Sequence, residues 1–477
     1  MAAEAARFHI EAIELFERPV HLRLPFRFGV VTLTHCPQAF VRARVALPDG
    51  RSGWGAAAEL MAPKWFDKNL ALSNEDNFDQ LRRALHAGRD AYLSRTRADT
   101  AFGHFAAHHS ALIAAGAERG DNALVSCFGP AVLDRALLDA LGHALGHSFY
   151  DLVRSNAIGL DARLTPDLAG LDLDGFLASL RSAPRIALRH TVGLLDAITD
   201  ADVQQRVHDG LPETLEETIQ ATGCRWYKLK VSGQEAADID RLSRIAAVLQ
   251  RLPKIDITLD GNEQFPDADA AVAFWRRVLA TPALERLAAH THYIEQPLPR
   301  AVALTSDVRP LAAMRPVLID ESDDRMDAFE RAIEQGYTGV SSKQCKGVYR
   351  SLLNAARCHR RNAQTHAARY FMSAEDLTTQ AGLAVQQDLA LVNLIGLTHV
   401  ERNGHHYVDG FAGQGGGPAE AAAFLHAHPG LYEAAPHGNA HLAVHHGLLD
   451  LRSLTSVGFA SGAEPDRTTL EALRPGT

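Results

Sequence analysis

Short apolar runs alternate with longer amphipathic stretches from about residue 185 onward. The apolar runs are typical of buried parallel strands: RWYKLKV, KIDITLD, THYIEQP, PVLIDES, GVSSK and IGLTHVE. The stretches between them have helical periodicity, and in residues 235–252 the apolar positions fall three or four apart. This spacing gathers apolar side chains on one face of a helix, where they can pack against a sheet.

The alternation predicts a (β/α)8 barrel. One strand and one helix recur roughly every 25–35 residues, which gives about eight units between residues 186 and 405. Strand–helix repeats of this length require a parallel sheet with right-handed crossovers. No GxGxxG follows the first strand, so an open dinucleotide-binding sheet is the weaker alternative.

Two further segments flank the predicted barrel. Residues 1–185 combine β-like runs, a hairpin signal at Asp49-Gly50 and a helical pattern over 129–154, so we expect an α+β capping domain. The barrel is expected over 186–410. Residues 411–477 begin with a glycine-rich linker and contain a strand–turn pattern, which predicts a C-terminal segment that returns to the cap.

Composition narrows the class of protein. Hydrophobic residues make up 46% of the 477 residues and charged residues 22%, which excludes a mainly disordered chain. The net charge is −9 without a Lys/Arg-rich block, so we expect no nucleic-acid or membrane partner. We find no signal peptide pattern and no apolar run of about 20 residues. Five scattered cysteines without a CxxC motif indicate a reducing compartment, and we expect a cytoplasmic protein.

Lysine is rare in this chain. Only seven of the 48 basic residues are lysine, and four of these form two close pairs, Lys228 with Lys230 and Lys343 with Lys346. Arginine cannot give up its proton at useful pH, whereas lysine can. The two pairs are therefore candidates for acid–base chemistry, although we interpret Lys346 as a cation at a helix start.

Acidic residues end three successive predicted strands. Asp260, Glu295 and Asp320 are one strand–helix unit apart, and Lys230 and Lys343 end the strands on either side of them. Because catalytic groups in such barrels gather at the carboxyl ends of the strands, these side chains should converge. Three carboxylates form a hard oxygen site suited to Mg²⁺. Glu321 is the alternative to Asp320 as the third ligand.

The segments YKLKV, LDGNEQF, YIEQPL, IDES and VSSKQCKG together resemble the enolase superfamily, in its muconate-lactonizing-enzyme-like and mandelate-racemase-like branches. The resemblance implies that Asp260, Glu295 and Asp320 bind Mg²⁺, with Mn²⁺ as a substitute. It also implies that Lys230 and Lys343 are the acid and base. Such enzymes remove a proton next to a carboxylate and stabilise the resulting ene-diolate.

Three more residues take supporting roles by the same resemblance. Lys228 would lower the pKa of Lys230 by like-charge repulsion and help to hold the substrate carboxylate. Asn262 matches a polar residue that supports the metal ligands, and Glu401 matches a glutamate that contacts the substrate carboxylate. Glu375 stands near the place of a catalytic histidine in mandelate-racemase-like members, and the strand end HVERNGH lacks the Asp-x-Asp of dipeptide epimerases.

The reaction stays open at this point. Lysines on opposite faces favour a racemase or epimerase acting on a small carboxylate. An acid-sugar dehydratase, a cycloisomerase or an o-succinylbenzoate-synthase-like lyase are alternatives, and a Schiff-base aldolase or a non-catalytic barrel are remote ones. We expect a homo-oligomer. Loops at 25–37 and 59–66, which carry Phe26, Phe28 and Trp65, should close the barrel mouth and set specificity.

Overall fold

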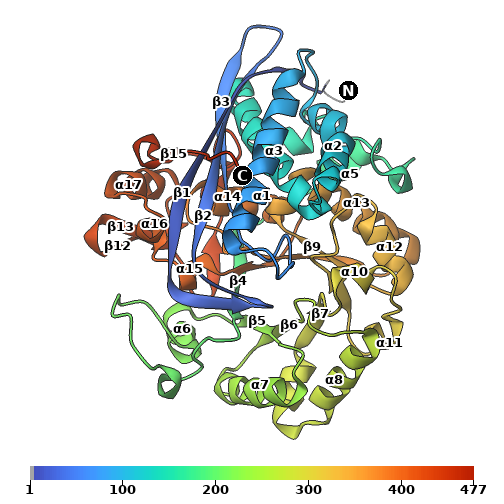
Figure 1. Cartoon of the computed structure of the whole chain (residues 1–477), viewed down its shortest axis with the longest axis vertical. Coiled ribbons are helices and arrows are strands. Elements are labelled where there is room, and N and C mark those ends of the chain that lie inside the picture. The colour runs from blue at the N-terminus through green and yellow to red at the C-terminus, as the bar shows by residue number, and fades with distance from the viewer. Residues whose placement is uncertain (1–4, 477) are drawn as a thin grey trace.

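A closed barrel of eight parallel strands forms the centre of the computed structural model, which describes residues 5–476 (Figure 1). Neighbouring strands follow in chain order, and the last pairs with the first through Val400 opposite Leu188, which closes the barrel. The strands are β4 (Arg185–Val192), β5 (Trp226–Lys230), β6 (Asp256–Asp260), β7 (Thr291–Glu295), β8 (Val317–Ile319), β9 (Gly339–Ser342), β10 (Phe371–Ala374) and β11 (His399–Arg402).

Helices surround the barrel. α7, for example, buries Leu242, Ile245 and Leu249, as the periodicity predicts, and exposes the charged residues Glu235, Asp240 and Arg244. The helices of this layer are α6 (Leu215–Thr222), α7 (Glu235–Leu249), α8 (Ala268–Ala280), α9 (Glu285–Ala289), α10 (Arg300–Ala303), α11 (Arg309–Ala312), α12 (Ala328–Gln335), α13 (Val348–Thr365) and α14 (Leu383–Leu394).

Two helices begin later than the sequence indicates. We predicted helices over 323–336 and 378–394, but α12 starts at Ala328 and α14 at Leu383. The residues before them belong to the loops that leave the carboxyl ends of β8 and β10. In those loops Asp323 accepts a hydrogen bond from Asn354 of α13, and Asp376 accepts one from the backbone N of Asn403 after β11. This tertiary bonding overrides the local helical preference.

An antiparallel sheet and three long helices form the N-terminal part. The sheet order is β15-β1-β2-β3, and the hairpin turn at Asp49-Gly50 joins β2 to β3 as predicted. Figure 1 shows the long β1–β2 ribbon beside α3. The elements are β1 (His9–Phe28), β2 (Val31–Ala46), β3 (Ser52–Leu60), α1 (Asn74–Ser94), α2 (Ala101–Glu118), α3 (Ala123–Leu145), α4 (Phe149–Arg154) and α5 (Leu173–Ser179).

The C-terminal residues contact both other parts. β15 pairs with β1 through Ala472 opposite Phe16, and β14 pairs with β4 through Leu448 opposite Ala187. Arg18 of β1 also donates two buried hydrogen bonds to Glu420 of α17. The elements are α15 (Gly404–Tyr407), α16 (Gly410–Gly413), α17 (Pro418–Ala427), β12 (Tyr432–Ala435), β13 (Asn439–Leu442), β14 (Leu448–Asp450) and β15 (Glu471–Ala472).

The segment 25–37 is mostly strand, where the sequence indicated a loop. It forms the ends of β1 and β2, and the chain reverses at Gly29, whose φ of 49° suits glycine. Phe26 pairs with Leu33 across this hairpin. The hairpin end reaches the barrel, because Leu194 N donates to Arg27 O in the loop after β4.

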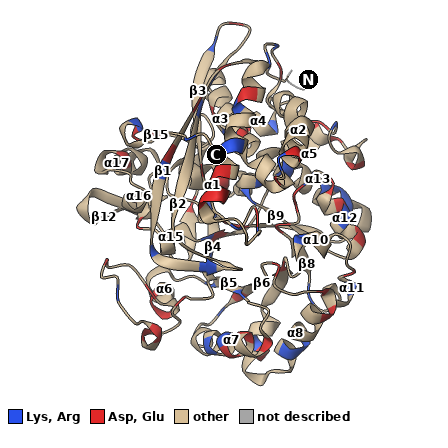
Figure 2. Cartoon of the chain, viewed as in Figure 1, with Lys and Arg blue, Asp and Glu red and all other residues tan. Residues whose placement is uncertain are grey.

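Charged residues of both signs are interspersed on the outer helices, as Figure 2 shows for α7 and α12. Among residues 5–476, no helix is long and apolar enough to span a membrane.

Candidate active site

The carboxyl ends of β5, β6 and β7 bring the first site residues into register. Lys230 stands opposite Asp260, and Asp260 stands opposite Glu295. All three are buried, and so are Asp320 after β8 and Lys343 after β9. The structure therefore brings these five sequence-predicted residues to one end of the barrel, because adjacent parallel strands end at the same edge.

Lys228 lies at the centre of a cluster of carboxylates. Its Nζ donates hydrogen bonds to Glu295 at 2.9 Å, Glu375 at 2.7 Å and Glu401 at 2.9 Å, and it lies 2.9 Å from Asp260 Oδ2. Burial opposes the charge on Lys228, but these four carboxylates outweigh burial and raise its pKa well above the ordinary value. Lys228 is therefore a fixed cation in this arrangement.

The other three lysines each contact an acid of the same group. Lys230 Nζ lies 2.5 Å from Asp260 Oδ2, and Lys343 Nζ lies 2.7 Å from Asp320 Oδ2. Lys346 is buried, donates to Ser341 and lies 3.5 Å from Asp320 Oδ1. Lys346 does stand near a helix start, two residues before α13, as we interpreted it, but its buried ammonium lies inside the site.

These contacts shift the pKa values of several acids and bases in the site. Burial favours the neutral form of Asp320, but Lys343, Lys346 and Lys228 outweigh it and lower its pKa. The pKa of Asp260 is also lowered, by Lys228 and Lys230 against the effect of burial. Asp320 in turn raises the pKa of Lys343, again against burial. Opposite charges at such distances hold each other ionised.

Glu295 differs from its neighbours. Burial, followed by the nearby charges of Asp260 and Glu375, raises its pKa well above the ordinary value. Its Oε1 accepts from Lys228, whereas Oε2 lies near the same ammonium without hydrogen-bond geometry. One oxygen of Glu295 is thus left without a hydrogen bond.

The predicted supporting residues occupy two places. Asn262 and Glu321 lie together, since Asn262 Nδ2 donates to Glu321 Oε1 at 3.4 Å. Glu401 is deeper in the barrel and accepts from Thr191 at 2.5 Å and from Asn403 Nδ2 at 3.2 Å, besides Lys228. The carboxylate of Glu401 is therefore fully engaged with the protein.

A polar layer below the site was not foreseen as part of it. Arg189 of β4 is fully buried and donates to Glu375 at 2.5 Å and to Ser373 at 3.0 Å. Glu375 thus bridges Arg189 and Lys228. The sequence offered one signal, an arginine directly after the apolar run IAL in the strand RIALRHTV.

A cavity lies between the barrel mouth and the cap. Lys230, Lys343 and Asn262 contribute to it from the barrel, while Phe28 and Trp65 cover it from the cap. Lys343 Nζ lies 4.3 Å from the centre of the Trp65 indole ring, a cation–π contact. The free volume is about 20 Å³, room for about one water molecule. A substrate can therefore enter only if side chains or the hairpin end move.

The donor set suits a hard divalent cation. Asp260, Glu295 and Asp320 supply carboxylate oxygens, and Glu295 Oε2, Glu321 Oε2 and Asn262 Oδ1 are buried without hydrogen-bond partners. Such orphaned oxygens are costly unless a ligand occupies them. Among residues 5–476, however, no three acidic, histidine or cysteine side chains form a finished metal-binding arrangement. Lysine ammonium groups contact several of these oxygens instead.

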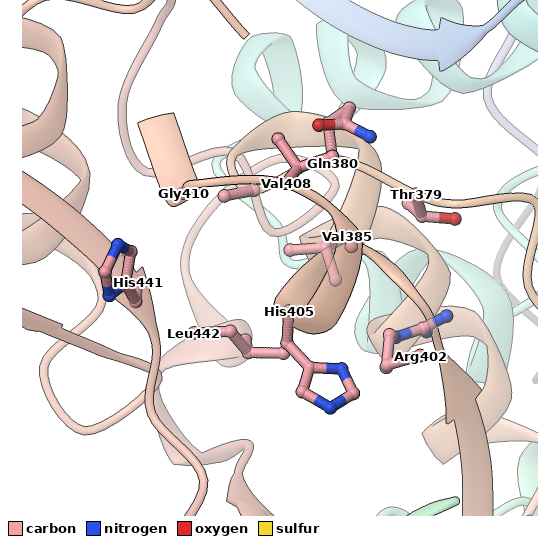
Figure 3. A pocket seen from close by; sticks show the side chains of 11 residues that line it. Thr379, Gln380, Val385, Arg402, His405, Val408, Gly410, His441 and Leu442 are labelled. Carbon is pink, nitrogen blue, oxygen red and sulfur yellow. The ribbon is translucent and has the colours of Figure 1, made fainter. Parts of the chain in front are cut away.

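A second pocket lies behind the ends of β10 and β11, and Figure 3 shows Arg402, His405 and Gln380 around it. Arg402 pairs with Asp388 and lies 3.3 Å from Asp376 Oδ1, so two acids neutralise its charge. Arg402 supports the candidate active site indirectly, because it contacts Asp376 in the wall of the cavity.

Residues 210–416 match the family described as enolase C-terminal domain-like. A search of proteins with curated functions found no match.

Solved structures with the same fold cover nearly the whole chain. An enolase from Bradyrhizobium, in complex with magnesium and mandelic acid, has a TM-score of 0.59 at 16% identity, over 98% of both chains. An N-succinyl Arg/Lys racemase from Bacillus cereus has a TM-score of 0.58 at 16% identity, over 97% of this chain and 96% of that one. A dipeptide epimerase from Enterococcus faecalis, in complex with Mg and L-Leu-L-Tyr, has a TM-score of 0.60 at 14% identity, over 95% and 99%.

The predicted fold and resemblance are confirmed by these matches. With its closed barrel and its strand-rich cap, the chain has the fold of these solved structures, and residues 210–416, which hold seven of the eight barrel strands, match the enolase C-terminal domain-like family.

Proposed function

We propose that this protein is a Mg²⁺-dependent racemase or epimerase that removes the proton next to a carboxylate of a small molecule. One observation carries the proposal: Lys230 and Lys343 line the same small cavity from strands on either side of the carboxylate-bearing strands. Two lysines that face one cavity can act on one carbon atom from two sides. The superfamily relatives with racemase and epimerase activity support this assignment.

Asp260, Glu295 and Asp320 would hold the Mg²⁺ ion, and Mn²⁺ is expected to substitute for it. A bound divalent cation supplies positive charge where the substrate carboxylate becomes an ene-diolate. The chain itself supplies a second positive charge nearby, the fixed ammonium of Lys228. Burial of the whole cluster strengthens both effects, because water screens charges less in a closed cavity.

The two lysines exchange roles according to the hand of the substrate. A general base accepts the α-proton as a neutral amine, and the other lysine returns a proton from its ammonium on the opposite face. In this structure Asp320 holds Lys343 as an ammonium. If Asp320 bound a metal cation, it would no longer hold Lys343 as an ammonium, and Lys343 could lose its proton more easily. Metal binding and the ability of Lys343 to act as a base are therefore linked.

Deuterium exchange tests the proposal. We would incubate the enzyme with Mg²⁺ and a panel of chiral carboxylic acids in D₂O and follow loss of the α-proton by NMR. Lys230→Ala and Lys343→Ala should each abolish racemisation, while each variant still exchanges the α-proton of one enantiomer. If one lysine alone supports exchange and a substrate with a β-leaving group is consumed, the enzyme is a dehydratase or a related lyase.

Metal removal provides the second test. Chelation should abolish exchange, addition of Mg²⁺ or Mn²⁺ should restore it, and Asp260→Asn should prevent restoration. Exchange in a verified metal-free sample would overturn the metal assignment.

A further inference from the structure

Asn403 follows β11 and lines the active-site cavity. It is 2% exposed, and its backbone N donates to Asp376 Oδ2 at 2.7 Å, which fixes its position. Its side-chain Nδ2 donates to Glu401 Oε1 at 3.2 Å. Its Oδ1 is buried and has no hydrogen-bond partner among residues 5–476.

The orientation of this amide is determined by its neighbour. A carboxylate such as Glu401 accepts hydrogen bonds, so the amide NH₂ of Asn403 must face it. The oxygen is therefore the group left over, a buried neutral acceptor on a residue of the cavity wall. A buried amide oxygen without a partner costs about 1–3 kcal/mol, which a ligand with an N–H or O–H group would recover.

The cavity wall offers no free negative charge for an ammonium group. Among the described residues that line it, Asp376 carries the one carboxylate. Its Oδ1 accepts from Thr379 N at 2.9 Å and its Oδ2 from Asn403 N at 2.7 Å, and Arg402 lies 3.3 Å from Oδ1. The ligand group that donates a hydrogen bond to Asn403 Oδ1 is therefore expected to be neutral.

The remaining wall is largely apolar. Phe26 and Phe28 lie with their ring centres 5.1 Å apart, and Leu377 and Ala62 complete this side. Such a surface suits a compact aliphatic or aromatic substituent. Trp65 adds a buried Nε1 without a partner among the described residues, a donor for a ligand oxygen.

We propose that Asn403 Oδ1 determines specificity for a carboxylate that carries a neutral hydrogen-bond donor, a hydroxyl or a secondary amide N–H, together with a compact apolar substituent. This inference rests on the function proposed above and adds the substrate class. A free amino acid, with its ammonium group, is excluded from efficient turnover. A hydroxyl and a secondary amide both offer Asn403 a neutral hydrogen-bond donor, and the experiment below distinguishes between them.

The experiment compares matched pairs of carboxylates in D₂O with Mg²⁺. The pairs are N-acetylleucine with N-acetyl-N-methylleucine, and 2-hydroxy-4-methylpentanoate with its 2-methoxy analogue, and free leucine is the charged probe. In at least one pair we expect the donor-bearing acid to exceed its methylated partner at least tenfold in kcat/KM for α-deuterium exchange. Free leucine should be slower than that acid. The pair that shows the preference identifies the donor as amide or hydroxyl.

Two variants assign the preference to Asn403. In Asn403→Leu, which removes the acceptor at similar volume, the ratio within the pair should fall to about twofold or less. Asn403→Ala gives the same readout if the leucine variant does not fold. Asn403→Asp, which supplies a negative charge, should shift the preference toward free leucine. Each ratio compares two probes on one protein, so a general loss of folded enzyme does not change it.

Calorimetric binding of the same probes to the Mg²⁺-loaded enzyme separates this inference from the proposed function. Preferential binding of the donor-bearing acid without any exchange supports the role of Asn403 and overturns the racemase proposal. Exchange with equal rates within both pairs, or a preference that persists in Asn403→Leu, overturns the inference and leaves the function standing. Absence of both binding and exchange for every probe overturns the substrate class.

Discussion

At the scale of single residues, the active site depends on charges that compensate one another inside the barrel. Lys228 contacts four carboxylates, and Arg189 supports the same group from below. The sequence identified Lys228 through the rarity of lysine in this chain. It did not identify its partners, since Glu375 and Glu401 come from strands about 150 residues or more further along. Their convergence follows from closure of the barrel.

Loss of Lys228 should therefore destabilise the native state. Lys228→Met leaves several buried carboxylates without their shared cation, and we expect a loss of about 3–5 kcal/mol in the free energy of unfolding of the metal-free protein at pH 8. In the wild type, Lys228 is the largest of the charges that lower the pKa of Glu401. Without this lysine the carboxylates gain protons more easily in the native state, so the defect should shrink as the pH falls toward 5. Urea unfolding at both pH values measures this difference.

Lys254→Met is the matched control, because Lys254 is exposed. It should change stability by less than about 0.5 kcal/mol at either pH. A defect in Lys228→Met that is the same at pH 8 and pH 5 would contradict the compensation argument.

At the scale of elements, the cap is held by close backbone contact and by buried ion pairs, of which Arg18 with Glu420 reaches the C-terminal segment. Strand β3 lies directly against α3 at Gly55, where an ideal Cβ would be 2.0 Å from Ala140 N and 2.5 Å from Ala136 O. Both atoms are backbone, so no rotation of a side chain can make room. The strand pattern of SGWGAAAEL predicted β3, whereas the need for glycine at this position comes from the helix packed on it.

Gly55→Ala should force β3 and α3 apart. We expect a loss of at least about 1–3 kcal/mol in the free energy of unfolding, since overpacking moves backbone. Gly417→Ala provides the control, because nothing lies within 4 Å of a Cβ there. Its cost should stay within about 1 kcal/mol, the usual effect at a helix N-cap. Thermal and urea unfolding measure both, and equal losses would contradict the close packing.

The ion pair between Arg18 and Glu420 joins the C-terminal segment to β1. Both side chains are 2% exposed, and the two hydrogen bonds measure 2.8 and 3.0 Å. Arg18→Met should cost about 3–5 kcal/mol, because it leaves Glu420 buried and unpaired. A double variant that adds Glu420→Leu should recover most of this loss. Urea unfolding of the single and double variants checks the prediction.

Arg44→Met serves as the control for this pair. Arg44 lies in the same sheet and pairs with Glu11 at 3.1 Å, but its side chain is 44% exposed. We expect a loss of no more than about 1 kcal/mol. If Arg18→Met is as mild as this control, apolar packing rather than the ion pair attaches the C-terminal segment.

At the scale of the whole molecule, the barrel and the cap meet around three histidines next to the candidate active site, of which His190 and His406 are buried and His405 is half-buried. His190 of β4 contacts His405 and His406 of α15 edge to face. Burial lowers the pKa of His405 to about 4 and that of His190 and His406 well below the ordinary value. These three side chains are therefore neutral at pH 7, and the interface depends on that state.

The fold should consequently be sensitive to mild acid. A histidine whose native pKa lies below its unfolded value of about 6.5 contributes its full stability above pH 6.5 and loses it as the pH falls toward the native pKa. We expect the free energy of unfolding to decrease by on the order of 1–2 kcal/mol for each such histidine between pH 7 and 5. Urea unfolding across this range measures the slope.

His405→Gln should flatten that slope, whereas His290→Gln should not, because His290 is exposed. The same slope in both variants and in the wild type would contradict the role of the histidines. Both variants place a neutral polar side chain that cannot take up a proton in this pH range. The comparison therefore measures the effect of protonating the histidine alone.

The sequence by itself determined the order of the strand–helix units, the residues that end the barrel strands and the resemblance to the enolase superfamily. Periodicity carries this information, because each element buries its own apolar face. The domain boundaries, the homo-oligomer and the cytoplasmic location remain predictions. Tertiary structure alone decided that Lys346 is buried, that 25–37 is the end of a hairpin and that Asn403 lines the cavity. These features depend on partners from distant strands, and local patterns along the chain do not encode such partners.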